Sequence, residues 1–249
     1  MSQPVTQHQV EIAGNLRFWQ EKKLLRRIYT GFYQRIVALI DPALPGVVVE
    51  IGSGVGNLKT HYPSAVATDL FPNPWLDLAC DGYDLPFREQ AVSHLILFDV
   101  FHHLRAPRAF LREARRVLVP GGRVIVFDPY ISLLSWLAYG VFHHEPIAWR
   151  APIDLSDSVK KPIDYYAAQG NATRLFFRDT GKTWLTGWQP VHAEVLASFS
   201  YLLSGGFSKP SLYPEAALPF LEFLDRGLSI APRLFGARCL VAFKTAGPG

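Results

Sequence analysis

Hydrophobic and polar positions change their spacing along the chain, which predicts alternating helices and strands. Between residues 15 and 40, apolar side chains recur at helical intervals with basic residues between them, so this stretch predicts one amphipathic helix. Short apolar runs with the length of buried strands follow at 46–52, 65–70, 92–100 and 123–128. The stretch "APRAFLREARRVLVPGG" (106–122) predicts an amphipathic helix that ends at Pro120, Gly121 and Gly122.

Apolar strands joined by helical crossovers predict an α/β fold, with a doubly wound (Rossmann-like), mostly parallel sheet of seven strands. After residue 130 the pattern changes: 130–149 looks helical, while 192–203 and 237–244 look like strands flanking a helix at 214–228. We therefore expect a single domain over residues 1–249. Its expected parts are an N-terminal helical segment (1–41), a core (42–130), a lid insertion after strand five (131–190) and C-terminal strands with a helix (191–249).

Composition fits a folded protein without a disulfide scaffold. Hydrophobic residues make up 49% of the 249 positions and charged residues 18%, which supports a full core. Cys80 and Cys239 match no metal motif and are expected to be small buried residues. The N-terminus lacks the pattern of a secretory signal, and the apolar run at 131–142 is too short for a bilayer core of about 30 Å. These features predict a cytoplasmic protein.

The net charge of +4 partly gathers in the N-terminal helix. Such a helix is expected to cover the sheet with its apolar stripe, and a weak contact with an anionic membrane surface is the alternative. The basic residues are not concentrated as a nucleic-acid interface requires, so no nucleic-acid partner is expected.

Glycines at the end of the first strand leave the backbone without side chains, which is typical of a turn that binds a ligand. The pattern E-x-G-x-G-x-G is formed by Glu50, Gly52, Gly54 and Gly56. A dinucleotide fingerprint would have its third glycine at position 57, where Asn57 stands. Asp69 ends the second strand, at the place where an acid binds the ribose hydroxyls of an adenosine in doubly wound folds. The turn and the acid together predict an adenosine cofactor.

Successive motifs of the core resemble those of a known family. "EIGSGVG", "TDL", "CDGYDLPF", "ILFDVFHHL" and "REARRVLVPGGRVIVFDPY" are similar, in this order, to the motifs of class I S-adenosylmethionine-dependent methyltransferases, in the branch called methyltransferase type 11. The resemblance covers about residues 45 to 130. It implies S-adenosylmethionine as the cofactor and a methyl-transfer reaction. The first crossover helix departs from the family, because the sequence leaves room for only about two turns.

The resemblance also implies roles for residues at the cofactor. Glu50 would help to hold the turn and the ammonium group, and Phe98 and Asp99 would present a carbonyl or carboxylate to that ammonium. Asp69 would accept both ribose hydroxyls, with Leu70 against the adenine. The methionine and ribose portion would be lined by Gly52, Ser53 and Gly54. The adenine amine would lie near Cys80, Asp81 and Gly82.

Two histidines are the first candidates for a catalytic base. His102 and His103 follow strand four at the carboxyl edge of the sheet, and imidazole titrates near neutral pH. Capping a helix or packing the loop is the alternative role. His143 and His144, beside Glu145, are alternative candidates for the base or for chelating a metal. A bare H-H-E lacks the spacing of a helical metal site, so a surface or packing role and no metal are expected. Tyr165 and Tyr166 are further candidates.

The acceptor is expected to be a small molecule. The region 131–190 is rich in aromatic residues, and flat rings stack on apolar or sugar-like molecules. O-methylation of a sugar or polysaccharide-related metabolite, either free or lipid-linked, is the first hypothesis, with N- or C-methylation also open. A nicotinamide-dependent oxidoreductase and a non-catalytic cofactor-binding protein are the alternative classes. The sequence gives no oligomeric state.

Overall fold

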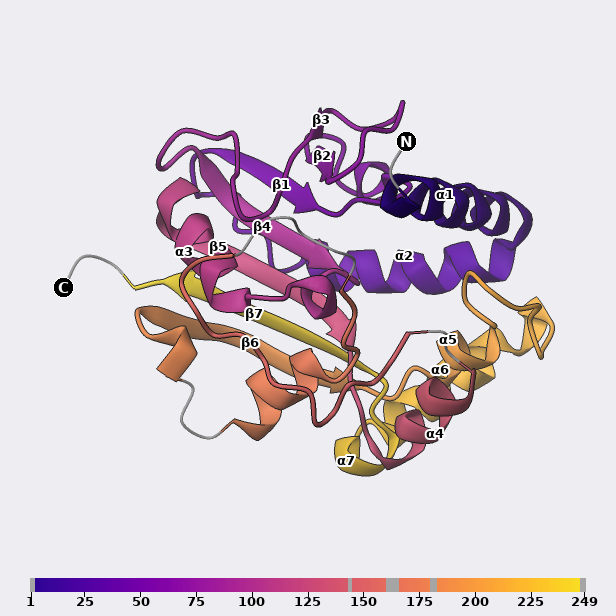
Figure 1. The fold of residues 1–249 in the computed structure, drawn as a ribbon. Helices are drawn as coiled ribbons and strands as arrows, with labels where there is room; N and C mark the ends of the chain where they lie inside the picture. Colours follow the sequence, from indigo (N-terminus) through magenta and orange to yellow (C-terminus); the bar gives the residue numbers. More distant parts are fainter. Residues whose placement is uncertain (1–2, 143–144, 160–165, 180–182, 247–249) are drawn as a thin grey trace.

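A seven-stranded sheet forms the centre of the computed structural model, which describes residues 3–142, 145–159, 166–179 and 183–246 (Figure 1). The strands are β1 Val47–Ile51, β2 Val66–Asp69, β3 Leu78–Ala79, β4 Val92–Phe98, β5 Leu118–Pro129, β6 Trp188–Leu196 and β7 Arg238–Thr245. Their order is β3-β2-β1-β4-β5-β7-β6. Neighbours from β3 to β5 are parallel, and β7 is antiparallel to β5 and β6. The predicted mostly parallel seven-stranded sheet is confirmed.

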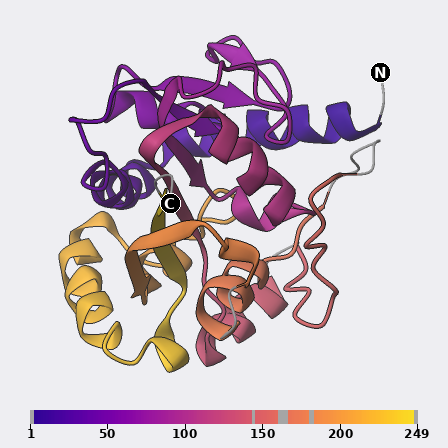
Figure 2. The same cartoon turned by 90° about the vertical axis from the view of Figure 1, so that its left-hand side faces the viewer.

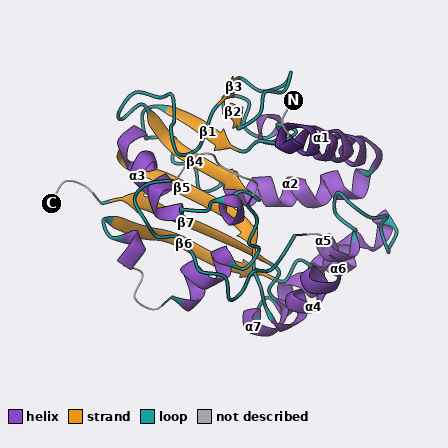
Figure 3. Cartoon of the chain, viewed as in Figure 1, coloured by secondary structure: helices purple, strands orange, loops and turns teal. Residues whose placement is uncertain are grey.

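Helices flank this sheet along its length (Figure 3). The α-helices are α1 Gln3–Glu21, α2 Lys23–Val37, α3 Pro107–Val117, α4 Leu133–Phe142, α5 Phe199–Leu203, α6 Leu218–Leu228 and α7 Pro232–Phe235. The short 3₁₀ segments are η1 Asn57–Thr60, η2 Phe101–His103, η4 Thr183–Leu185 and η5 Glu215–Ala217, and η3 Thr173–Arg178 is a π-helix.

Two hydrophobic layers lie on opposite faces of the sheet. Along β1, Val48 packs in the layer that contains α2, whereas Val49 packs in the layer that contains α3. This alternation follows from the two-residue period of a strand. Figure 2 shows α2 and α6 on one side of the sheet, with α3 and the orange segment after β5 on the other. The sheet is therefore covered on both faces, as a parallel sheet requires.

The N-terminal helix is broken where one continuous helix was predicted. The chain leaves helical geometry at Lys22 (φ −98°, ψ 90°), so α1 and α2 are separate helices and α1 begins earlier than predicted. The Lys22 ammonium donates to the carbonyls of Ser204, Gly206 and Lys209 at 2.7, 2.6 and 2.8 Å. These carbonyls lie far along the sequence, which is why the periodicity of the helix did not reveal the break.

The basic side chains of α2 contact other parts of the chain. Arg27 and Lys23 pair with Glu215, at 3.0 and 3.5 Å. Arg35 pairs with Glu194 at 2.8 Å. The opposite stripe of α2 is buried against the sheet. Among the described residues, no helix has both the length and the apolar character needed to cross a membrane.

The predicted strand 192–203 was wrong in its second half. β6 ends at Leu196, Ser198 takes the left-handed conformation (φ 56°), and the chain then forms α5. The cause is a carboxylate from α6. Asp225 accepts hydrogen bonds from the amides of Phe199 and Ser200 at 2.5 and 3.1 Å, which satisfies the first turn of α5.

Two other predicted boundaries were also wrong. The helix over 106–122 ends at Val117, and Pro120 and Gly121 lie within β5, where the register with β4 shifts at a bulge. The crossover after β1 is shorter than the predicted two turns. It consists of the single 3₁₀ turn η1, which begins after Gly56 in the left-handed conformation.

Candidate active site

A cavity of about 1220 Å³ opens at the carboxyl ends of the parallel strands. This is the edge at which open α/β sheets bind ligands. The ends of β1, β2 and β4 line it, together with α2, α4 and α5. All thirteen residues predicted for the cofactor and for catalysis line this one cavity. His143, His144 and Tyr165 lie outside the described residues.

The glycine turn after β1 needs glycine for its conformation. Gly52, Gly54 and Gly56 have φ of +66°, +54° and +73°, in the left-handed region that other residues rarely adopt. A Cβ on Gly52 would also lie 2.5 Å from a methyl carbon of Val100. Trp75 donates its indole N–H to the carbonyl of Gly54 at 2.8 Å. The turn is held in one shape and presents bare backbone to the cavity.

Asp69 fastens this turn to the end of β2. Its carboxylate accepts the amide N–H of Gly54 at 2.9 Å and that of Leu70 at 2.7 Å. The side chain is buried and lines the cavity. A carboxylate oxygen has a second lone pair, so each oxygen can accept a further hydrogen bond from a ligand hydroxyl.

Glu50 is a buried acid at the bottom of the turn. Burial, opposed in part by the Ser53 hydrogen bond and reinforced by Asp69, raises the pKa of Glu50 to about 8. Its Oε2 atom has no hydrogen-bond partner among the residues that the structure describes. A ligand cation beside this oxygen would satisfy it and favour its charged form.

Because the pKa of Glu50 is raised in the folded protein, the free energy of unfolding should depend on pH. The folded state retains a proton that the unfolded state loses above about pH 4.5, so stability falls as the pH rises from there to about 8. Relative to Glu50→Gln, the cofactor-free wild type should lose about 2 kcal/mol of unfolding free energy between pH 5 and pH 7. Urea unfolding at both pH values measures this, and parallel pH profiles for the two proteins would contradict it.

A second wall of the cavity holds an ion pair between a buried arginine and a partly exposed aspartate, which the sequence did not reveal. The Arg238 guanidinium binds the Asp99 carboxylate and lies 4.3 Å from the ring centroid of Tyr201. The Arg238 side chain is only 3% exposed, and Asp99 has a left-handed φ of 56°. Because Arg238 holds the Asp99 carboxylate, the backbone carbonyls near the end of β4 are better candidates than this carboxylate for binding a ligand ammonium.

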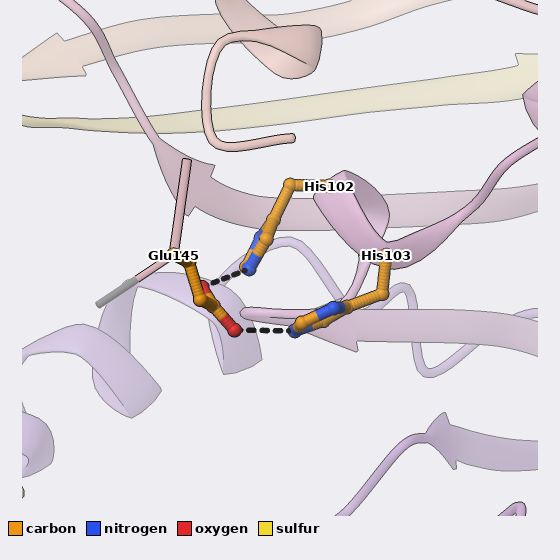
Figure 4. Close-up of side chains that lie close together, drawn as sticks. All are labelled: His102, His103 and Glu145. Carbon is orange, nitrogen blue, oxygen red and sulfur yellow. Dashed lines mark ion pairs between the residues drawn. The ribbon is translucent and has the colours of Figure 1, made fainter. Parts of the chain in front are cut away.

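The predicted histidines meet an acid from the segment after β5 (Figure 4). His102 Nδ1 donates to Asp128 at 3.0 Å, and its Nε2 lies 3.4 Å from Glu145 Oε2. His103 Nδ1 donates to the carbonyl of Tyr166 at 2.8 Å, and its Nε2 lies 3.6 Å from Glu145 Oε1. The sequence expected a surface or packing role for Glu145. The structure places it at the cavity instead.

The two imidazoles differ in charge. Burial alone would lower the pKa of His102, but the Asp128 and Glu145 carboxylates outweigh it and raise that pKa to about 10. Burial, together with the nearby charge of His102, lowers the pKa of His103 to about 4. Without a ligand, His102 is a cation between two carboxylates and His103 is neutral at pH 7.

Comparison with known proteins identifies the core. Residues 49–126 match a family model described as the methyltransferase domain. An S-adenosylmethionine-dependent methyltransferase of Thermotoga maritima has the same fold, with a TM-score of 0.52 and 17% identity over 92% of this chain and 97% of that chain. Residues 49–126 therefore form a methyltransferase domain, in a chain with the fold of class I S-adenosylmethionine-dependent methyltransferases. This assignment removes the nicotinamide-dependent alternative.

Other relatives agree with the methyltransferase domain. Geranyl diphosphate C-methyltransferase of Streptomyces coelicolor, solved with Mg²⁺, geranyl diphosphate and S-adenosyl-L-homocysteine, superposes with a TM-score of 0.52 at 13% identity, over 88% of this chain and 80% of that chain. A protein described as "Probable tRNA methyltransferase 9B" of Bos taurus is 28% identical over 109 residues, or 38% of this chain. This chain spans only 24% of the length of that relative.

The cavity of the methyltransferase domain fits its cofactor. Glu50 offers a buried carboxylate oxygen suited to an ammonium, and Asp69 offers acceptors for hydroxyl groups. Leu70 is 46% exposed at the cavity, which provides an apolar surface for a flat base. Near it, Asp81 accepts the amide of Tyr83 at 2.9 Å, so this loop is ordered by its own side chain.

Proposed function

We propose that the protein transfers a methyl group from S-adenosylmethionine to a hydroxyl oxygen of a small molecule with an apolar or sugar-like body. One observation carries this proposal: the cofactor residues and the His102–His103–Glu145 cluster line the same cavity. A donor and an acceptor bound there would be held close together, which is the main requirement of methyl transfer.

The lining of the cavity supports a small acceptor with a large apolar part. Aromatic and aliphatic side chains from α2, α4, α5 and the loop after α5 surround the space beyond the histidines: Tyr29, Tyr33, Leu134, Leu137, Tyr139, Phe199, Tyr201, Leu202, Leu203 and Phe207. Such rings stack on flat, lipid-like or sugar-like groups. A lipid-linked acceptor, with its hydroxyl at the histidines and its chain along α4, fits this distribution of polar and apolar walls.

The cluster would bind the acceptor hydroxyl and remove its proton. Asp128 and the Tyr166 carbonyl hold the Nδ1–H groups of the two histidines, so both Nε2 atoms are directed at the Glu145 carboxylate. Because His102 already carries both ring protons, the neutral His103 and the Glu145 carboxylate are the groups that can take a proton. The cofactor supplies a methyl group on a positively charged sulfur. The acceptor oxygen forms the new bond to the methyl carbon, the carbon–sulfur bond breaks with its electron pair remaining on sulfur, and the hydroxyl proton passes to the cluster.

A labelled-methyl assay tests this function. Purified protein is incubated with methyl-labelled S-adenosylmethionine and either a small-molecule lipid and metabolite extract or total tRNA. We expect label in a small-molecule product and none in tRNA. His103→Gln should lower that rate at least about 100-fold, the range for loss of acid–base catalysis, without weakening cofactor binding. His192→Gln is the matched control, because His192 also lies near a glutamate but does not line the cavity.

The relatives described as tRNA methyltransferases define the opposing result. Label in tRNA with no small-molecule product would contradict the proposal and would favour a nucleic-acid acceptor. Binding of the cofactor without label in either fraction would instead favour the non-catalytic alternative.

A further inference from the structure

The donor atoms of His102, His103 and Glu145 have the spacing of ligands to one metal ion. One donor atom from each residue can be chosen so that all three lie within 4.8 Å of one another. The two imidazole-to-carboxylate separations, 3.4 and 3.6 Å, are longer than charge-assisted hydrogen bonds, which are about 2.7–2.9 Å. Ligands about 2.1 Å from a shared ion, at a tetrahedral angle, lie about 3.4 Å apart.

Hydrogen bonds to neighbouring groups orient both imidazole rings in the way that is typical of metal-binding histidines. A metal-binding imidazole uses one nitrogen for the ion and donates its other N–H to a carboxylate or a backbone carbonyl. His102 does so to the buried Asp128 carboxylate at 3.0 Å, and His103 does so to the Tyr166 carbonyl at 2.8 Å. In both cases the nitrogen left for an ion is Nε2, the one that faces Glu145.

A neighbouring amide suggests a further ligand. The Gln169 side chain is buried, and its nitrogen donates to Glu145 Oε2 and lies 3.4 Å from His102 Nε2. Its Oε1 atom has no hydrogen-bond partner among the described residues. Rotating this amide by half a turn would exchange the two atoms and direct the oxygen at the same place as the other donors.

We propose that His102, His103 and Glu145 bind one divalent first-row transition-metal ion, such as Zn²⁺, in the wall of the cavity. Two imidazoles and one carboxylate are a ligand set that such ions prefer, and three protein ligands leave a position open. Resting on the proposed function, the open position would bind the acceptor oxygen and favour its ionised form, with the hydroxyl proton released to water because the cluster's own donor atoms are bound to the ion. The ion would thus position the acceptor opposite the methyl donor.

Direct titration tests the metal site independently of activity. After dialysis against a chelator and then into chelator-free buffer, the full chain is titrated with Zn²⁺ by calorimetry. We expect saturable binding of one ion. Glu145→Gln and, separately, His103→Gln should each weaken it at least about tenfold, whereas His192→Gln should leave it unchanged. Circular dichroism and S-adenosylmethionine affinity, measured on the same samples, show that the variants are folded.

The outcomes separate the metal site from the proposed function. Absence of saturable Zn²⁺ binding to the wild type, or equal affinity in folded Glu145→Gln and His103→Gln, would overturn the metal site while leaving methyl transfer intact. Zn²⁺ binding with the expected variant pattern, in a protein that methylates no small molecule, would support the site and overturn the function.

Discussion

Replacing Asp69 with alanine is expected to weaken binding of S-adenosylmethionine at least tenfold. The carboxylate is placed to accept ribose hydroxyls while it holds the amides of Gly54 and Leu70. Removing one charge-assisted hydrogen bond costs about 1.5–3 kcal/mol, which corresponds to a factor of roughly ten or more in affinity. The glycine turn would also lose its attachment to β2, so the loss should be at the upper end of this range. Calorimetric titration measures it.

Asp77→Ala is the matched control for this experiment. Asp77 also accepts a backbone amide of β2, that of Ala67 at 2.8 Å, but it pairs with Lys59 and does not line the cavity. We expect its cofactor affinity to equal that of the wild type. Unchanged affinity in a folded Asp69→Ala protein would mean that the cofactor lies elsewhere or that its ribose does not meet this acid.

Replacing Asp99 with asparagine is expected to destabilise the protein by about 3–5 kcal/mol, because it removes the carboxylate that is paired with a buried guanidinium. Arg238 is almost completely enclosed by Asp99, Tyr201 and Phe127. Without Asp99, the guanidinium would remain buried without the carboxylate that binds it. Adding Arg238→Met removes the unpaired guanidinium charge and should recover much of the lost unfolding free energy. Urea unfolding of both single variants and the double variant gives the coupling energy.

Arg35→Ala provides the comparison for this ion pair. Arg35 pairs with Glu194 on the surface, where such contacts contribute about 0–1 kcal/mol. We therefore expect a much smaller change than for Asp99→Asn. Strictly additive effects of Asp99→Asn and Arg238→Met would contradict the inferred coupling between the two side chains.

The sequence predicted the features that depend on neighbouring residues. The alternation of strands and helices follows from local periodicity, and it led to the mostly parallel sheet that the structure contains. The glycine turn and Asp69 were found for the same reason, since each ends a strand that its own apolar run defines. Residues at the carboxyl ends of adjacent parallel strands meet at one edge, which is why the predicted site residues line one cavity.

Contacts between distant segments were not predictable in this way. Glu145 reaches the histidines only because the chain after β5 returns over the cavity, and no spacing within "HHE" shows this. Arg238 begins a strand near the end of the chain, and its partner Asp99 is 139 residues earlier. The helix break at Lys22 likewise depends on carbonyls of residues 204–209. A charged residue at the edge of an apolar strand was the only available signal for Arg238.

A crystal structure of the protein with S-adenosylhomocysteine would show where the cofactor lies relative to the histidines, because it locates the sulfur from which the methyl group leaves. We expect the adenosine ribose at Asp69, the ammonium near Glu50, and the sulfur facing the open space beside His102, His103 and Glu145. A cofactor bound with its sulfur turned away from this cluster, or outside the cavity, would contradict methyl transfer at this site.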